Sequence, residues 1–261
     1  MTDLIYKPKG KAGEYASLAC NHYRGCDHGC EYCYVPNVLR CDKGDFHENV
    51  TPRLPPDAFL AQLDKDAARW RKKLGPPPYP TLDTLPQDGD ENRILLSFTC
   101  DPYCIADVQY ELTREVIKVL HRHLFRVTTL TKGGTRALRD IDLFFPGIGG
   151  DHFASTLTLT DPVLSRQVEP GAATPYDRVE ALRAFSDVGV HTWVSLEPVI
   201  DIYRTLTLIE VAHQYVDFWK VGKMNHQVTT IDWAFFAREV VALLDSLGAK
   251  YLIKEDLRKY L

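Results

Sequence analysis

The chain has 261 residues, of which 45% are hydrophobic and 25% charged, a composition typical of a soluble globular protein. Its net charge of −4 gives no overall attraction to nucleic acid, so binding of phosphates would need a local basic patch. No apolar run approaches the roughly 18 residues that span a membrane, and the N-terminus lacks the apolar segment of a signal peptide. Seven cysteines, three of them close together, indicate metal binding in a reducing cytosol rather than a disulfide framework. We therefore expect a cytoplasmic protein with no membrane contact.

The predicted elements alternate between strands and helices. Residues 1–14 are polar and rich in Gly and Lys, which predicts an arm on the surface, and residues 15–261 form one domain. Apolar residues at helical spacing predict a helix over Asp57–Leu74, followed by a Pro-rich, acidic connector over residues 75–92. Strands are expected at Tyr15–Cys20, Ile94–Phe98, Val127–Leu130, Phe153–Leu159, Val190–Leu196 and Phe218–Val221, with a last short one at Tyr251–Ile253. The helices between them fall at Glu111–His123, Thr135–Asp142, Tyr176–Val188, Arg204–Tyr215 and Asp232–Leu247. Such alternation predicts an α/β fold with parallel strands and right-handed crossovers, in six β/α units.

Three cysteines lie in one short segment, Asn21–Tyr34, with the sequence NHYRGCDHGCEYCY. Cys26, Cys30 and Cys33 are spaced C-x3-C-x2-C, with an aromatic residue just before the last. Three thiolates on one loop can hold three irons of a [4Fe–4S] cluster, whose fourth iron is then open to a ligand that is not protein. The segment therefore predicts a reactive cluster rather than one that only carries electrons.

The pattern C-x3-C-x-aromatic-C resembles the signature of the radical S-adenosylmethionine (SAM) superfamily. The longer string N-x-Y-R-G-C-x-H-G-C-x-Y-C-Y resembles the spore photoproduct lyase-like branch of that superfamily. This resemblance implies a partial (β/α)6 barrel of the TIM type, a [4Fe–4S] cluster and SAM as cofactors, and a flavodoxin- or ferredoxin-like one-electron donor. It also implies lyase or oxidoreductase-type radical chemistry, in which SAM is cleaved to a 5′-deoxyadenosyl radical that abstracts a hydrogen atom from the substrate. The branch acts on thymine dimers, so a nucleic-acid base or nucleotide is the expected substrate, with a small metabolite or a peptide as the alternative.

A non-catalytic iron–sulfur or zinc module, used for binding or sensing, is the alternative of another class. Zinc usually takes four ligands, and His22 and His28 could complete the set with the cysteines. Of the other thiols, Cys20 is expected to be buried in a strand and Cys41 to lie in a loop, so neither is favoured as a fourth ligand.

Polar residues follow the predicted strands, at the edge of a β/α barrel where functional residues gather. Lys132 offers a cation for the SAM carboxylate, and Ser155 a hydroxyl that assists it. Thr99 and Asp101 can bond the amino group and the ribose. By resemblance, the T-x-D, T-K and Ser positions are the ones that hold SAM, and Glu197 ends the fifth strand at the same rim.

Two pairs of residues near this rim have a less direct predicted role. Arg166 and Glu169 match an R-x-x-E-P pattern common in the branch and would reach toward SAM or the substrate, with a surface ion pair as the alternative. Arg24 and His28 lie inside the cysteine segment, where donors near the cluster sulfurs would raise its reduction potential.

Cys100 and Cys104 are the candidate catalytic thiols, because both follow the second strand on the rim. In the lyase branch a cysteine at this strand end returns a hydrogen atom to a substrate radical, but Phe98 stands at that place here, with the sulfur shifted to Cys100. Small buried residues are the alternative for both thiols. Other candidate hydrogen donors are Tyr34, Tyr103 and Tyr110. The densest basic run, R-W-R-K-K at residues 69–73, could meet phosphates or be a solvated helix face.

Overall fold

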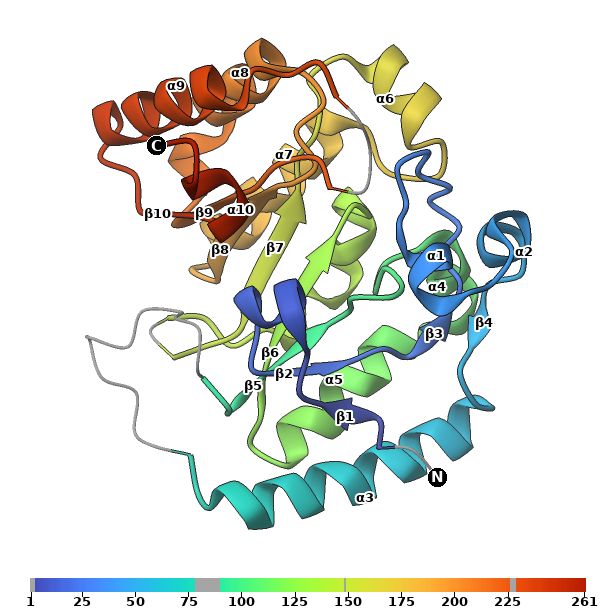
Figure 1. The fold of residues 1–261 in the computed structure, drawn as a ribbon. Coiled ribbons are helices and arrows are strands. Elements are labelled where there is room, and N and C mark those ends of the chain that lie inside the picture. Colours follow the sequence, from blue (N-terminus) through green and yellow to red (C-terminus); the bar gives the residue numbers. More distant parts are fainter. Residues whose placement is uncertain (1–2, 78–89, 148, 226–228) are drawn as a thin grey trace.

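One eight-stranded sheet organises the fold (Figure 1). The computed structural model describes residues 3–77, 90–147, 149–225 and 229–261, so most of the predicted connector lies outside the described residues. The strand order is β1-β2-β5-β6-β7-β8-β9-β10, and only β1 runs antiparallel to its neighbour. The strands are β1 (Ile5–Tyr6), β2 (Leu18–Cys20), β5 (Arg93–Leu96), β6 (Arg126–Thr131), β7 (His152–Thr156), β8 (His191–Leu196), β9 (Phe218–Val221) and β10 (Tyr251–Ile253). A separate hairpin pairs β3 (Tyr23–Arg24) with β4 (Thr51–Pro52).

Helices connect the parallel strands and cover one face of the sheet (Figure 1). The longer helices are α3 (Pro56–Leu74), α5 (Leu112–Arg122), α7 (Pro175–Asp187), α8 (Ile202–Ala212) and α9 (Trp233–Ser246). Shorter ones are α1 (Val35–Leu39), α2 (Lys43–Glu48), α4 (Ile105–Tyr110), α6 (Pro162–Val168) and α10 (Glu255–Arg258), with 3₁₀ turns η1 (Gly10–Glu14), η2 (Gly134–Leu143) and η3 (His213–Tyr215). No helix in the described part of the chain is long and apolar enough to cross a bilayer.

The structure confirms the α/β class and the parallel pairing of the predicted strands. Closure into a barrel is not confirmed: the sheet is open, with β1 and β10 at its edges among the described residues. The last short strand does form, and it pairs with β9. The predicted helix over Thr135–Asp142 is a 3₁₀ helix instead. The first strand begins at Leu18 rather than Tyr15, and Tyr15 and Ala16 before it pack against the face of the sheet that carries Ala19.

The predicted surface arm is partly wrong, because its apolar residues enter the core. Ile5 pairs with Cys20 of β2 and is fully buried, and Leu4 is 4% exposed. The backbone N–H of Leu4 donates to Oδ2 of the buried Asp66 on α3, at 2.7 Å. These contacts join residues that are far apart in the sequence. The mostly polar composition of residues 1–14 therefore did not predict that Leu4 and Ile5 would be buried.

Side chains alternate between the two faces of the sheet, as strand geometry requires. The helix face holds the larger core, in which Phe153 of β7 stacks on Phe185 of α7 with ring centroids 4.0 Å apart. The opposite face, here called the inner face, has a smaller cluster formed by Ala19, Leu95, Ala154 and Trp193. Tyr15, Ala16, Phe98, Leu130 and Phe218 pack against that cluster.

Replacing Phe153 by Ala should destabilise the protein by about 3–5 kcal/mol, because a fully buried ring is lost and leaves a cavity beneath α7. Urea unfolding followed by circular dichroism measures the change. Tyr176→Ala, at a position 61% exposed on the same helix, should have little effect. Equal losses for the two variants would contradict this account of the core.

Candidate functional site

The cysteine segment leaves the sheet at the end of β2, and Asn21 fixes its first turn. The side-chain oxygen of Asn21 accepts hydrogen bonds from the backbone N–H groups of Phe98 at 2.7 Å and Thr99 at 3.0 Å. Its amide nitrogen donates to the hydroxyl of Tyr6 at 2.7 Å. Asn21 therefore joins the ends of β2 and β5 to β1, a role that only the extended sequence motif could have suggested.

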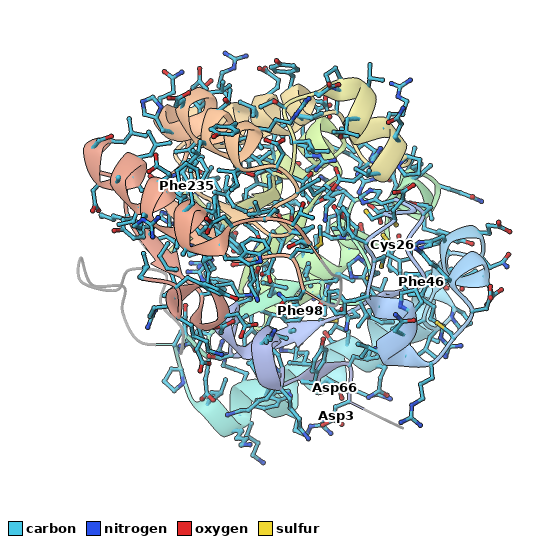
Figure 2. The ribbon with its side chains drawn as sticks, turned by 45° about the horizontal axis from the view of Figure 1, so that its top comes forward. Asp3, Cys26, Phe46, Asp66, Phe98 and Phe235 are labelled. Carbon is cyan, nitrogen blue, oxygen red and sulfur yellow. The ribbon has the colours of Figure 1, made fainter. Side chains whose placement is uncertain are left out.

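The next part of the segment is held against α2 and α4. The N–H of Cys26 donates to the carbonyl of Phe46 at 3.0 Å, and the two residues lie together in Figure 2. Gly25 has a φ of 80°, and a Cβ there would lie 2.5 Å from that carbonyl, so only glycine fits. The carboxylate of Asp27 accepts from the first N–H groups of α4, those of Ile105 at 2.8 Å and Ala106 at 2.7 Å. Sequence reasoning missed this capping role of Asp27.

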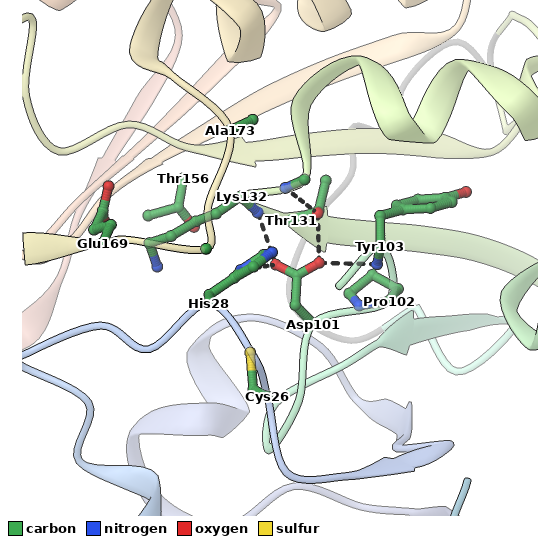
Figure 3. Close-up of polar contacts among 12 residues, drawn as sticks. Cys26, His28, Asp101, Pro102, Tyr103, Thr131, Lys132, Thr156, Glu169 and Ala173 are labelled. Atoms are coloured by element: carbon green, nitrogen blue, oxygen red, sulfur yellow. Dashed lines mark hydrogen bonds and ion pairs between the residues drawn. The ribbon is translucent and has the colours of Figure 1, made fainter. Parts of the chain in front are cut away.

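The carboxylate of Asp101 connects several parts of the site (Figure 3). Its Oδ1 accepts from the N–H of Tyr103 at 2.9 Å and from the hydroxyl of Thr131 at 2.6 Å, and its Oδ2 accepts from the N–H of Lys132 at 2.7 Å. Nδ1 of His28 lies 3.4 Å from Oδ2. Burial opposes ionisation, yet the pKa of Asp101 is lowered overall because His28 and these hydrogen bonds favour the carboxylate. The structure thus places Asp101 between the cysteine segment and the ends of β5 and β6.

The two histidines of the segment are used inside the protein. His28 is 2% exposed, and its Nε2 accepts from Arg136 at 2.8 Å while its Nδ1 faces Asp101. Burial, together with the nearby Arg136 and Lys132, lowers the pKa of His28 to about 4. His22 is fully buried, bonds the hydroxyl of Thr113 at 2.8 Å, and has a pKa that burial lowers to about 3. The two imidazoles that a zinc site would need therefore have other partners.

The C-terminal part of the segment packs on the turn after α6. The N–H of Glu31 donates to the carbonyl of Val168 at 2.8 Å, and the N–H of Gly171 donates to the carbonyl of His28 at 2.9 Å. A Cβ on Gly171 would lie 2.0 Å from the carbonyl oxygen of Asp27, so this approach requires glycine. The cysteine segment is therefore clamped from both sides.

A buried ion pair strengthens that clamp. Glu169 is 1% exposed and lies 2.5 Å from the guanidinium of Arg178 on α7, which is equally buried. The Tyr32 hydroxyl, from the cysteine segment, also donates to Glu169. The alternative of a surface ion pair does not hold for Glu169, because Glu169 is buried and its partner is Arg178. Arg166 is exposed on α6, with no ion pair among the described residues. Arg178 lies nine positions after Glu169 and on the next helix, so no pattern within one element pointed to the pair.

Lys132 supplies a cation beside the cysteines. Its ammonium lies 5.5 Å from the centre of the Tyr32 ring, while its backbone is fixed by Asp101 and by a bond from the N–H of Ala173 at 2.9 Å. The positive charge of Lys132 acts on both Cys30 and Cys33, where it opposes the rise in thiol pKa caused by burial. The ammonium is therefore close to where an anionic ligand of the cluster would lie.

The three cysteine thiols suit an iron–sulfur cluster by their chemistry. Burial raises the pKa of Cys30 to about 11 and that of Cys26 as well, so without a metal both are protonated thiols, and a metal that binds them displaces the proton. Each thiol is within electrostatic reach of the next, since Cys30 acts on Cys26 and Cys33 acts on Cys30. Among the described residues, no three His, Cys, Asp or Glu side chains already converge on a point where they could hold a single metal ion. Three thiols without a fourth protein ligand fit a cluster with one open iron better than tetrahedral zinc.

Neither Ser155 nor Thr99 hydrogen-bonds to Lys132 in the described part of the chain. Ser155 is fully buried on the helix face, where its hydroxyl donates to the carbonyl of Thr131 at 3.4 Å. The next residue, Thr156, points the other way, toward Lys132 (Figure 3). Thr99 is half-buried in the loop after β5, with its N–H held by Asn21. Arg24 is exposed on β3.

Glu197 belongs to a second polar group, at the far strand ends. Its carboxylate accepts from the hydroxyl of Tyr15 at 2.7 Å and the amide of Asn225 at 2.6 Å, and it lies 2.5 Å from the ammonium of Lys254. Desolvation and the charge of Glu197 raise the pKa of Tyr34, so the end of the cysteine segment lies near this group. The structure thus brings Glu197 to the same rim, but already bound to three protein partners.

The four cysteines outside the C-x3-C-x2-C motif differ in their burial. Cys20 is buried in β2 and Cys41 is exposed in a loop, as predicted. Cys100 and Cys104 are 9% and 1% exposed and belong to the core cluster of the helix face. Burial raises the pKa of Cys100 to about 11. Tyr103 is buried like them, whereas Tyr110 is 37% exposed.

The basic run at residues 69–73 is largely committed to structural contacts. Arg71 donates to the carbonyls of Gly75, His123 and Leu124 and to the side chain of Asn92, at 2.8–3.0 Å. Arg69 pairs with Asp66 and Asp3, each at 2.9 Å. These contacts favour the interpretation of the run as a helix face over that of a nucleic-acid patch.

Comparison with known proteins gives relatives and a shared fold. No protein-family model matches the chain. An uncharacterised protein of Mycobacterium tuberculosis is 28% identical over 184 residues, which are 69% of this chain and 48% of that protein. An uncharacterised protein of Methanocaldococcus jannaschii is 23% identical over 216 residues, which are 80% of this chain and 71% of that protein. The chain therefore spans about half the length of the mycobacterial relatives it matches.

Solved structures of radical SAM enzymes share the fold. A spore photoproduct lyase variant superimposes with a TM-score of 0.61 at 14% identity, over 90% of this chain and 76% of that chain. SuiB of Streptococcus suis bound to its precursor peptide SuiA also gives 0.61, at 12% identity, over 91% of this chain and 48% of that chain. TYW1 with a lysine–pyruvate adduct gives a TM-score of 0.54 at 15% identity, over 94% of this chain and 78% of that chain. The chain has the mixed α/β fold, with a mostly parallel sheet, of these enzymes.

Glu169→Ala should destabilise the protein by about 3–5 kcal/mol, because the Arg178 guanidinium would remain buried without a counter-charge. Chemical unfolding measures the loss. Glu180→Ala, on α7, is the matched control, since its pair with Arg183 is exposed and should matter little. A double variant, Glu169→Leu with Arg178→Met, should recover much of the stability, and no recovery would contradict the proposed cause.

Proposed function

We propose that the protein is a radical SAM enzyme that binds a [4Fe–4S] cluster through Cys26, Cys30 and Cys33. The observation that carries the proposal is the placement of these thiols on one clamped loop, beside the Lys132 ammonium, in a chain with the fold of radical SAM enzymes. When bound and reduced, such a cluster would supply the electron that cleaves SAM to a 5′-deoxyadenosyl radical able to abstract a substrate hydrogen atom. A flavodoxin- or ferredoxin-like donor in the cytoplasm is the proposed source of the electron.

The protein's own residues would position the cofactors. Asn21, Asp27 and Asp101 hold the cysteine segment at three points, so that the thiols are presented in a fixed arrangement. Lys132 would bind the carboxylate of SAM, since an ammonium pairs strongly with a carboxylate in a partly buried site. Thr99, Asp101, Ser155, Arg166 and Glu197 remain predicted SAM contacts, although Asp101 and Glu197 already accept several hydrogen bonds. Thr156 is an additional candidate, because it faces Lys132 where Ser155 does not.

For the substrate we propose a nucleic-acid base or nucleotide, in keeping with the lyase-like cysteine motif and with a neighbour solved with a dinucleoside spore photoproduct. A small metabolite or peptide is the second candidate, and the structural use of the basic run 69–73 favours it over a long nucleic acid. Steeply salt-dependent DNA binding would distinguish the two. Cys100 and Cys104 remain the candidate hydrogen donors.

Anaerobic reconstitution with iron and sulfide, reduction by dithionite and addition of SAM should yield 5′-deoxyadenosine, which chromatography with mass spectrometry detects. Cys26→Ala, Cys30→Ala and Cys33→Ala should each abolish both the product and the visible absorbance of the cluster, because three thiolates are the whole protein ligand set. Cys41→Ala, at an exposed loop position, is the control and should retain both. A fully loaded cluster that forms no 5′-deoxyadenosine would refute the proposal.

Lys132→Met should weaken SAM binding by about 10- to 100-fold, because a hydrogen bond to a charged group contributes about 1.5–3 kcal/mol. Equilibrium binding of SAM to the reconstituted protein measures the change. Lys65→Met, which removes an exposed lysine of α3, should leave SAM affinity unchanged. Equal affinities for Lys132→Met and the wild-type protein would exclude Lys132 as a carboxylate ligand.

A further inference from the structure

The segment between β1 and β2 contacts both edges of the open sheet. β1 lies at one edge and β10 at the other, yet residues between β1 and β2 bond to residues that follow β9 and β10. We call residues 7–17 the strap. The strands on either side of it are anchored in the core by Ile5 and Leu18, which are fully buried. The strap therefore bridges the side of the sheet that strand pairing leaves open among the described residues.

Ion pairs hold the middle of the strap against the C-terminal end of the chain. The ammonium of Lys11 pairs with Asp256 of α10. The carboxylate of Glu14 lies 3.5 Å from the ammonium of Lys254 and accepts from the N–H of Glu255 at 3.2 Å. These contacts of Lys11 and Glu14 are here called the latch. The same part of the strap also accepts or donates hydrogen bonds at 2.8 Å with two residues on or after β9, Lys220 and Asn225.

The strap has few contacts of its own that would fix it in place. None of residues 7–17 is buried, and Lys7 pairs with Glu91 at the surface. The 3₁₀ turn η1 has no side-chain cap, and Gly10 at its start has a φ of 59°. By contrast, Leu257 is fully buried and fixes α10 in the core. Segments with few buried contacts open locally at a low free-energy cost, so the strap is the mobile partner of the latch.

The C-terminal end of the strap covers the inner face. Tyr15, Ala16 and Ser17 line a cavity of about 30 Å³ on that face. The ring centre of Tyr15 lies 6.0 Å from that of Trp193, and the Tyr15 hydroxyl donates to Glu197 at 2.7 Å. Trp193 also lines the cavity and is only 3% exposed. Movement of the strap away from the sheet would therefore uncover the inner face from the side.

We propose that the strap opens and closes over the inner face, and that the latch sets how often it opens. Opening breaks the latch and the bond between Tyr15 and Glu197, while β1 and β2 stay paired because both are buried. The latch consists of partly exposed charges, so salt screens it and increases opening. An open strap admits a molecule to the inner face between the two edges of the sheet. The device stands on its own contacts and does not depend on the proposed radical chemistry.

Hydrogen–deuterium exchange of the full chain, measured by mass spectrometry, tests the motion of the strap. Peptides from residues 7–17, and the peptide that contains Glu255, should exchange faster than those of β7. Their exchange should be faster at high than at low salt concentration, because screening weakens the latch. Strap peptides that exchange no faster than β7 at either salt concentration would overturn the proposal.

Matched lysine variants test the latch. Lys11→Met removes the pair with Asp256 and should speed exchange of the strap about two- to fivefold, the effect of losing one exposed ion pair. Lys9→Met removes an exposed lysine of the same strap that has no ion pair among the described residues, and should leave exchange unchanged. Circular dichroism checks that each variant is folded. Equal exchange in the two variants would overturn the proposed latch.

Chemical modification of Trp193 tests whether opening uncovers the inner face. The reagent is 2-hydroxy-5-nitrobenzyl bromide, and peptide mass spectrometry locates the modified rings. Modification of Trp193 should rise in Lys11→Met by about the same factor as strap exchange, and not in Lys9→Met. Trp219, which is fully buried on the helix face, is the internal reference. Unchanged modification of Trp193 despite faster strap exchange would overturn the proposed access route. Neither measurement needs cluster or SAM, so its failure is distinct from a failure to form 5′-deoxyadenosine.

Discussion

The buried carboxylate of Asp101 is the constraint on which the site depends. A carboxylate at 7% exposure is stable only if donors surround it, and its donors come from the cysteine segment, the loop after β5 and the end of β6. These elements are far apart in sequence and meet only because parallel strands end at one edge. The position of the thiols, and of Lys132 beside them, therefore follows from satisfying one buried charge.

The second constraint is the close approach of backbones around the cysteine segment. Gly25 lies against Phe46 and Gly171 against Asp27, so the loop is fixed as much by the absence of side chains as by hydrogen bonds. The ion pair between Glu169 and Arg178 then attaches the same loop to α7 through Tyr32. A loop clamped in this way can present three thiols to a cluster without reorganising, which is what pre-organisation of a cofactor site requires.

On the inner face of the sheet, the side chains at the two ends of the strands differ in their chemistry. At the C-terminal ends of the strands lie the thiols, Lys132 and the group around Glu197, and at the N-terminal ends lies a small cavity lined by Arg93, His152 and Lys220. His152 and Thr156 are four positions apart on β7, a rise of about 13 Å at ~3.3 Å per residue. The apolar cluster of Ala19, Leu95, Ala154 and Trp193 lies between these ends.

The sequence by itself determined the α/β class, the succession of strands and helices along the chain, and the cysteine motif, because periodicity and motif spacing are local properties of the chain. It could not determine that Ser155 faces the helices, since alternation fixes a side chain's face only once the register is known. It also could not pair Glu169 with Arg178, or bury Ile5 from a polar arm, because those contacts join separate elements. Tertiary structure alone decided which polar groups lie together, because hydrogen bonding and burial act between segments that the sequence keeps apart.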